Sequence, residues 1–115
     1  MANSGLHGPH SLTADGVSNN VKGIGPGVYA LGQMKLNGNF LIEYVGRSDD
    51  DLAERLQQHV PKRYQHFKYG FLPSATAAFE KECHLYHDFS PADNKVHPAR
   101  PQGTNLKCPA CRIFG

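Results

Sequence analysis

The sequence lacks any long apolar run and any strong excess of charge. Its 115 residues include 12 Lys and Arg against 10 Asp and Glu, which gives a formal net charge of +2 at pH 7. This mild balance permits a nucleic-acid partner but does not argue for one. No stretch approaches the roughly 20 apolar residues of a membrane helix. The first residues, MANSGLHGPHSLTADG, have no basic start followed by an apolar block, so neither a membrane partner nor a secretory signal is expected.

Cysteine is also scarce. The three cysteines cannot all pair within the chain, and without a secretory signal we expect a reducing, cytoplasmic setting. In such a setting cysteines direct attention to metal binding.

Composition divides the chain into two segments. Residues 1–24 are rich in Gly, Ser, Asn, Asp and His with no apolar period, which predicts a flexible N-terminal leader. Residues 25–115 are predicted to form one domain, with a tail over 98–115 that contains several Pro and Gly residues. A chain of this length has room for a single hydrophobic core.

The folded part begins with a hairpin signal. Val28–Gln33 and Phe40–Val45 each have the composition of a short strand, and Asn37-Gly38 between them is typical of a tight turn. An antiparallel hairpin is therefore predicted over 27–46.

Two helices are predicted on either side of a third strand. Ser48 followed by three aspartates is typical of a capped helix start, and Pro61 would end that helix near His59. Aromatic residues alternate over His66–Leu72, which predicts a strand. The second helix is predicted over 75–89, so the order is strand, strand, helix, strand, helix.

One residue of the second helix interrupts its apolar stripe. The stripe follows a helical period through Ala75, Ala78, Phe79, Leu85, Tyr86 and Phe89. The stripe position between Phe79 and Leu85 holds Glu82, and a carboxylate facing a core is unfavourable unless it is paired or binds a cation. Glu82 is therefore either a stripe-edge residue that pairs with a nearby arginine or reaches solvent, or a metal ligand or catalytic carboxylate in a cleft.

The first helix and the hairpin carry side chains suited to phosphate chemistry. Arg55 and His59 lie four residues apart and share one helix face. A guanidinium can hold an anion, and an imidazole can move a proton. Tyr29 and Tyr44, one on each strand, could face the same way if the register allows, although a strand tyrosine is more often a packing residue.

Together these residues resemble a known family. Gly27-Val28-Tyr29 and Tyr44-Val45-Gly46 resemble the paired signature of GIY-YIG nucleases, and Leu52–His59 is similar to that family's leucine–arginine–histidine segment. The second helix resembles its glutamate helix through Glu82, and Asn94 falls where the family asparagine closes the site. The resemblance implies an α/β (α+β) fold with a small three-stranded antiparallel sheet flanked by helices.

The resemblance also implies roles in hydrolysing a phosphodiester bond of DNA. Glu82 would hold one divalent ion, Mg²⁺ or Mn²⁺. Tyr29 would help to position and deprotonate the attacking water, and Tyr44 would support it. Arg55 would neutralise charge on the phosphoryl oxygens, and His59 would be a general base or proton shuttle.

Further residues would order the site and hold the substrate. Asn94 would act through hydrogen bonds. Contacts with the phosphate backbone are expected from four basic residues, Arg47, Lys62, Arg63 and Lys68. The sequence leaves open whether the substrate is DNA or RNA and whether a protein partner supplies targeting.

The cysteines suggest a second metal. Cys108-Pro109-Ala110-Cys111 has the CxxC spacing of a zinc knuckle, which needs two more ligands. Cys83 and His87 lie one helical turn apart and would complete a structural Zn²⁺ site, with His84 and His97 in reserve for the fourth place. Such a site would attach the tail to the second helix. Alternatively, Cys83 is only a buried helix residue and the CxxC is a free or redox pair.

The sequence thus leads to a DNA endonuclease or nickase as the first hypothesis. One rival is a non-cleaving, zinc-stabilised module of the same fold that binds nucleic acid or a protein. Another is a small structural protein in which Glu82 is merely paired with Arg55. Cleavage that is lost on Glu82→Ala with the fold intact would separate the first hypothesis from both rivals.

Overall fold

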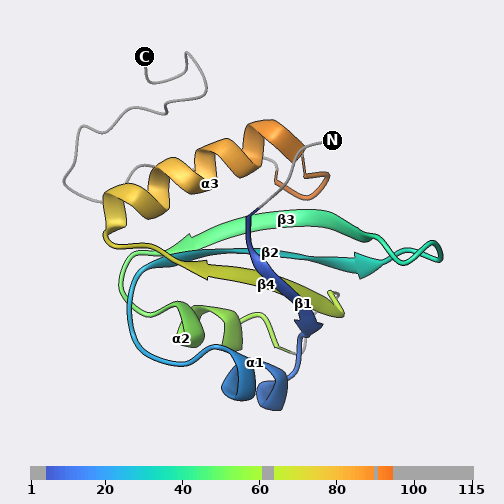
Figure 1. Cartoon of the computed structure of the whole chain (residues 1–115), viewed down its shortest axis with the longest axis horizontal. Coiled ribbons are helices and arrows are strands. Elements are labelled where there is room, and N and C mark those ends of the chain that lie inside the picture. The colour runs from blue at the N-terminus through green and yellow to red at the C-terminus, as the bar shows by residue number, and fades with distance from the viewer. Residues whose placement is uncertain (1–4, 61–63, 90, 95–115) are drawn as a thin grey trace.

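A computed structural model of the chain describes residues 5–60, 64–89 and 91–94. Within these ranges a four-stranded antiparallel sheet carries one long helix on one face and two short helices on the other (Figure 1). None of these helices is long and apolar enough to span a bilayer. In chain order the elements are β1 (His7–Ser11), α1 (Ala14–Asn20), β2 (Gly27–Met34), β3 (Phe40–Ser48), α2 (Leu52–Gln57), β4 (His66–Phe71) and α3 (Ala75–Phe89).

The strand order is β1-β4-β2-β3, so β3 forms one edge of the sheet. The predicted hairpin is present as β2 and β3, and the predicted third strand is present as β4. The expectation of three strands is corrected to four, because β1 pairs with the other side of β4. In that pairing His10 lies opposite Phe67, and Ser11 lies opposite His66.

The added strand and helix α1 come from the segment whose composition predicts a flexible leader. For residues 5–24 that prediction is corrected by the structure. The backbone of β1 finds hydrogen-bond partners on β4, and the Thr13 hydroxyl caps α1 by accepting a hydrogen bond from the Gly16 backbone at 2.9 Å. Leu12, Val17 and Val21 are buried in the core. The segment is polar and contains glycine, and it has too few apolar residues to show a helix or strand period in the sequence.

The predicted bounds agree with the structure for one of the two helices and differ for the other. Helix α3 spans Ala75–Phe89 as predicted, whereas α2 covers Leu52–Gln57 rather than a longer stretch from Ser48 to about His59. Ser48 is the last residue of β3, and its hydroxyl accepts a hydrogen bond from the Asp51 backbone at 2.9 Å. Asp51 is the actual N-cap of α2. The intervening turn brings α2 onto the face of the sheet opposite α3 (Figure 1).

The sheet separates two apolar clusters. The cluster on the side of α1 and α2 comprises Leu12, Val17, Val21, Tyr29, Leu31, Leu52, Leu56 and Phe67. The cluster under α3 comprises Val28, Ala30, Ile42, Val45, Ala78 and Leu85. Successive residues of β2 alternate between the two lists because side chains of a strand point to opposite faces. Both faces of β2 are therefore buried.

A bulge in the hairpin decides which face Tyr44 occupies. Near the turn the register is regular, with Gly32 opposite Ile42, but Leu31 lies opposite Tyr44, so Glu43 is an extra residue in β3. Directly opposed residues share a face, so Tyr44 joins Leu31 while Ile42 faces α3. Gly32 is required at this point, because a Cβ there would overlap the Leu41 carbonyl oxygen. Without the extra residue, Tyr44 would lie on the face of α3.

Candidate functional site

Three of the predicted site residues form an aromatic cluster on the face of the sheet covered by α2. Tyr29 comes from β2, Tyr44 from β3, and His59 follows the end of α2. The Tyr29 hydroxyl and His59 Nε2 are 2.9 Å apart and share a hydrogen bond. Ring centroids are 5.3 Å apart for Tyr29 and His59, 5.8 Å for Tyr44 and His59, and 6.5 Å for the two tyrosines. The register therefore places both tyrosines on the same face, which the sequence left open.

Gly46 allows Tyr29 to reach the edge strand. The two residues lie opposite each other across β2 and β3. A Cβ added at Gly46 would lie 2.5 Å from Tyr29 Cζ, which is too close for two carbon atoms that are not bonded to each other. The tyrosine ring therefore lies directly over the glycine, and the small residue of the Tyr44-Val45-Gly46 motif has a steric role.

Burial keeps Tyr29 protonated. The residue is fully buried, and this burial raises the pKa of its hydroxyl to about 12, although its contact with Arg55 acts to lower it. The same contact with Tyr29 raises the pKa of Arg55. Arg55 is otherwise exposed and donates a hydrogen bond from Nη1 to Gln58 Oε1 at 3.0 Å. At neutral pH this side of the site presents a neutral phenol beside a permanent cation.

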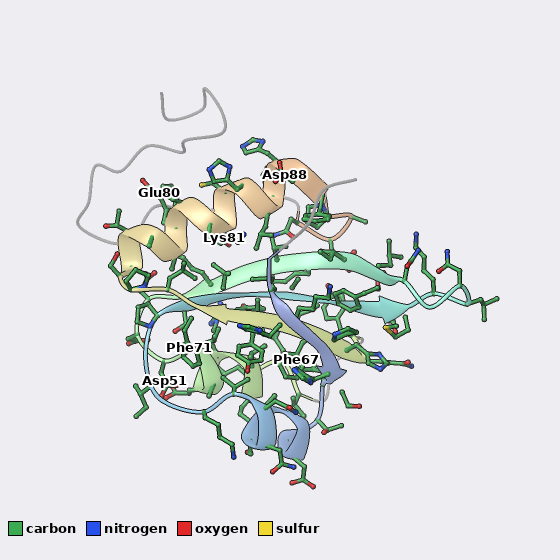
Figure 2. The ribbon with its side chains drawn as sticks, viewed as in Figure 1. Asp51, Phe67, Phe71, Glu80, Lys81 and Asp88 are labelled. Carbon is green, nitrogen blue, oxygen red and sulfur yellow. The ribbon has the colours of Figure 1, made fainter. Side chains whose placement is uncertain are left out.

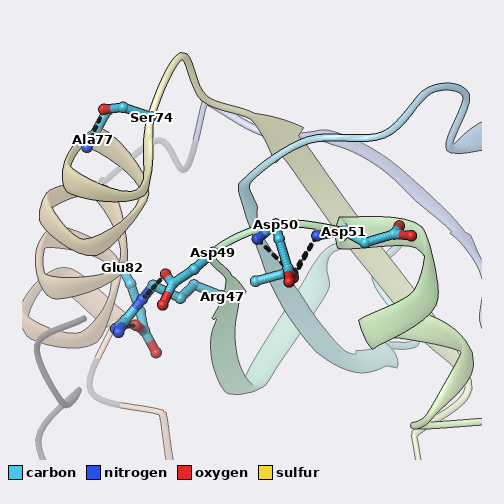
Figure 3. Close-up of polar contacts among 8 residues, drawn as sticks. Arg47, Asp49, Asp50, Asp51, Ser74, Ala77 and Glu82 are labelled. Atoms are coloured by element: carbon cyan, nitrogen blue, oxygen red, sulfur yellow. Dashed lines mark hydrogen bonds and ion pairs between the residues drawn. The ribbon is translucent and has the colours of Figure 1, made fainter. Parts of the chain in front are cut away.

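Glu82 projects from α3 on the opposite face, where it is buried and ion-paired (Figure 3). Its Oε1 accepts a hydrogen bond from Arg47 Nη1 at 2.8 Å, and Arg47 Nε donates to Asp49 Oδ1 at 2.7 Å. Glu82 thus lies on the buried side of α3, as the apolar stripe predicts. Glu80 lies on the side of α3 turned away from the sheet (Figure 2).

Removal from water dominates the proton affinity of Glu82. Burial raises the pKa of its carboxyl to about 7, and the charge and hydrogen bond of Arg47 lower it by less than burial raises it. Burial lowers the pKa of Arg47, but the hydrogen bond to Asp49 and the charge of Glu82 more than compensate. Glu82 also acts electrostatically on Tyr29 and Arg55, so the groups on the two faces lie within range of one another.

The segment after α3 binds the outer edge of β3. Asn94 Oδ1 accepts a hydrogen bond from the Val45 backbone N–H at 2.8 Å, and Asn94 Nδ2 donates to the Val45 carbonyl at 3.0 Å. The Tyr64 hydroxyl donates to Asp93 Oδ2 at 2.7 Å, and the Tyr64 ring stacks on Tyr44 at 6.3 Å. This network fixes the strand that carries Tyr44 and Gly46.

The sequence does not predict the contacts of some of these residues. Tyr64 lies outside any periodic segment, so no signal marks it. The sequence predicts Asp49 as an acidic residue in the first turn of a helix, whereas in the structure it forms an ion pair with Arg47. Arg47 itself, expected to contact phosphate, is held between two carboxylates, and the Lys68 ammonium lies 5.6 Å from the centroid of the Phe40 ring. Lys62 and Arg63 lie outside the described residues.

The structure describes only one side of the expected zinc site. Cys83 is buried and His87 is half-buried, both on α3, while His84 is exposed. The remaining candidates, Cys108, Cys111 and His97, lie outside the described residues. Among the residues that are described, no three His, Cys, Asp or Glu side chains form a group that could hold a metal.

No family model, curated protein or solved structure matches the chain.

Proposed function

We propose that the chain is a metal-dependent endonuclease or nickase that hydrolyses phosphodiester bonds of DNA, with a site of the GIY-YIG type. One observation carries the proposal. Tyr29, Tyr44, Arg55 and His59 converge on one face of the sheet, and the buried Glu82, on the other face, acts electrostatically on Tyr29 and Arg55. These residues come from β2, β3, α2, the turn after α2 and α3, and their types suit phosphate chemistry.

A divalent ion fits the environment of Glu82. The buried carboxylate already binds a cationic group, the Arg47 guanidinium, so the position accepts positive charge. Mg²⁺ commonly takes one or two protein carboxylates and completes its shell with water and substrate phosphate. Glu82 would hold the ion, with no need for a cluster of three protein ligands. When bound, the ion would polarise the scissile phosphate and stabilise the departing oxygen.

His59 is the residue best placed to take a proton. Tyr29 is fully buried and retains its own proton because its pKa is about 12, so a phenolate is rare at neutral pH. The hydrogen bond between the Tyr29 hydroxyl and His59 Nε2 would hold the imidazole in a fixed orientation for taking a proton from an attacking water. Tyr29 then orients the imidazole, and Tyr44 packs against the same ring.

The remaining residues bind the substrate or hold the site together. Arg55 is exposed, so its guanidinium can meet a phosphoryl oxygen and neutralise the charge that develops there. Asn94 holds β3 in place through both of its hydrogen bonds to Val45. Lys68, with Lys62 and Arg63, would contact the phosphate backbone, a sequence-independent interaction.

A structural Zn²⁺ on Cys83, His87, Cys108 and Cys111 belongs to the same proposal. The position of Cys83 and His87 four residues apart on α3 supports it, because residues at this spacing lie on the same side of a helix. The ion would fix the tail beside the site, and elemental analysis of purified protein would measure it.

A second candidate function is a non-cleaving module of this fold that binds nucleic acid or a protein. The ion pair between Glu82 and Arg47 favours it, since that pair satisfies the carboxylate without a metal.

A nicking assay on supercoiled plasmid with Mg²⁺ or Mn²⁺ distinguishes the two functions. Wild-type protein is expected to convert the plasmid to open circles, and Glu82→Ala is expected to lose this activity while retaining its circular dichroism spectrum. Glu80→Ala is the matched control, because it removes an exposed carboxylate from the same helix. DNA binding without cleavage by the folded wild type would favour the binding module.

A further inference from the structure

Arg47 is held by three side chains at the end of β3. Its Nε lies 2.7 Å from Asp49 Oδ1, its Nη1 lies 2.8 Å from Glu82 Oε1, and its Cζ lies 5.3 Å from the centroid of the Phe79 ring. Figure 3 shows the guanidinium between the two carboxylates. The side chains of Arg47 and Glu82 are 12% and 9% exposed, whereas that of Asp49 is 42% exposed. The contact between Arg47 and Glu82 is therefore shielded from water, whereas the contact between Arg47 and Asp49 is not.

An additional cation would be attracted by the carboxylates of this group and repelled by its guanidinium. When both carboxylates are ionised, one guanidinium faces two negative charges, which leaves a net charge of −1. Magnesium binds a carboxylate oxygen at about 2.0–2.1 Å, and Arg47 Nη1 already lies 2.8 Å from Glu82 Oε1. An ion on this carboxylate would therefore lie within a few ångströms of the guanidinium. In a shielded site two positive charges this close repel strongly.

We propose that the Arg47 guanidinium occupies the cation position of Glu82: it neutralises the carboxylate before metal binding, and a divalent ion must displace it. This inference rests on the proposed metal role of Glu82. Asp49 makes the exchange feasible, because a guanidinium that releases Glu82 keeps a partner at the surface. Phe79 provides a flat apolar surface beneath the guanidinium. The same displacement exposes an arginine at the site when the metal is bound.

The test measures Mn²⁺ binding by isothermal titration calorimetry on the full chain at about pH 8, above the pKa of about 7 of the Glu82 carboxyl, so that proton competition is reduced. Arg47→Gln removes the competing charge and is expected to bind Mn²⁺ about tenfold more tightly than the wild type or better. Arg47→Lys keeps the charge but loses the planar fork that bridges two carboxylates, so its affinity should fall between the two. Lys81→Gln is the matched control, since it removes one positive charge next to Glu82 in α3 and should bind as the wild type does.

Glu82→Gln is expected to abolish Mn²⁺ binding at this site. It therefore shows which part of the measured binding belongs to Glu82. If that variant loses Mn²⁺ binding but Arg47→Gln binds no more tightly than the wild type, the displacement of Arg47 is refuted and the metal role of Glu82 stands. If Glu82→Gln binds as the wild type does, both fail. Should Arg47→Gln not fold, as judged by circular dichroism, Arg47→Lys decides alone, and an affinity equal to that of the wild type refutes the inference.

Discussion

In the metal-free protein, Glu82 is expected to make folding less favourable as the pH rises from about 4.5 to about 7. Its pKa is about 7 in the folded protein, against 4.5 for an unperturbed glutamate. Between these values the unfolded chain releases the proton and the folded protein retains it. The contribution of Glu82 to stability is therefore fully present below pH 4.5, decreases through this window, and is constant above it.

The size of the effect follows from the two pKa values. A tenfold change in proton affinity corresponds to about 1.4 kcal/mol, so a pKa raised from 4.5 to about 7 corresponds to about 3 kcal/mol. Little of this is lost to solvent screening, because Glu82 is only 7% exposed. The desolvation of the carboxylate outweighs its ion pair with Arg47, as is common for buried charges.

Urea denaturation in EDTA at pH values from 4.5 to 8.5 measures this contribution. The free energy of unfolding of the wild type, minus that of Glu82→Gln, should decrease by about 3 kcal/mol across the window, because the glutamine does not titrate. Glu80→Gln controls for the loss of an exposed carboxylate on the same helix and should leave the pH profile of the wild type unchanged. A difference between wild type and Glu82→Gln that is constant or rises with pH would refute the reasoning.

The remaining predictions concern the tyrosine cluster and the second metal. Tyr29→Phe removes the hydroxyl that orients His59 and should lower kcat about 10- to 100-fold in plasmid nicking with KM nearly unchanged; wild-type kcat would contradict this role. Gly46→Ala forces a Cβ against the Tyr29 ring and should destabilise the fold by about 1–3 kcal/mol in urea denaturation, whereas unchanged stability would show that the ring is free to move. A zinc chelator should lower the Tm of the wild type, and Cys83→Ser should lose bound zinc in elemental analysis; full zinc content in that variant would place the ion elsewhere.

Much of the secondary structure can be predicted from local patterns. Helix α3 has the bounds that its apolar period indicates, and the Asn37-Gly38 turn lies between two strands as expected. The start of α2 is misplaced because Ser48 can cap a helix or end a strand, and only the pairing of β3 with β2 decides. Strand β1 escapes prediction because its backbone depends on β4, some 60 residues away, for hydrogen bonds.

The candidate site is predictable in part. The unusual position of Glu82 can be seen in the sequence, because the helical period places this charged residue on the apolar face of α3. The proximity of Tyr29 and Tyr44 is not visible, since it depends on the one-residue bulge at Glu43. The roles of these residues in cleavage remain predictions.

Local patterns are enough to predict the hairpin of β2 and β3, strand β4, helix α3, the carboxylate on an apolar stripe, and the types of side chain available for phosphate chemistry. Such features depend on neighbours within a few turns or a few strand residues. The strand register, the contact of Tyr29 with Gly46 and the pairing of Glu82 with Arg47 become apparent only in the folded protein. The physical reason is that register and ion pairs depend on segments brought together by folding, and a shift of one residue moves a strand side chain to the opposite face.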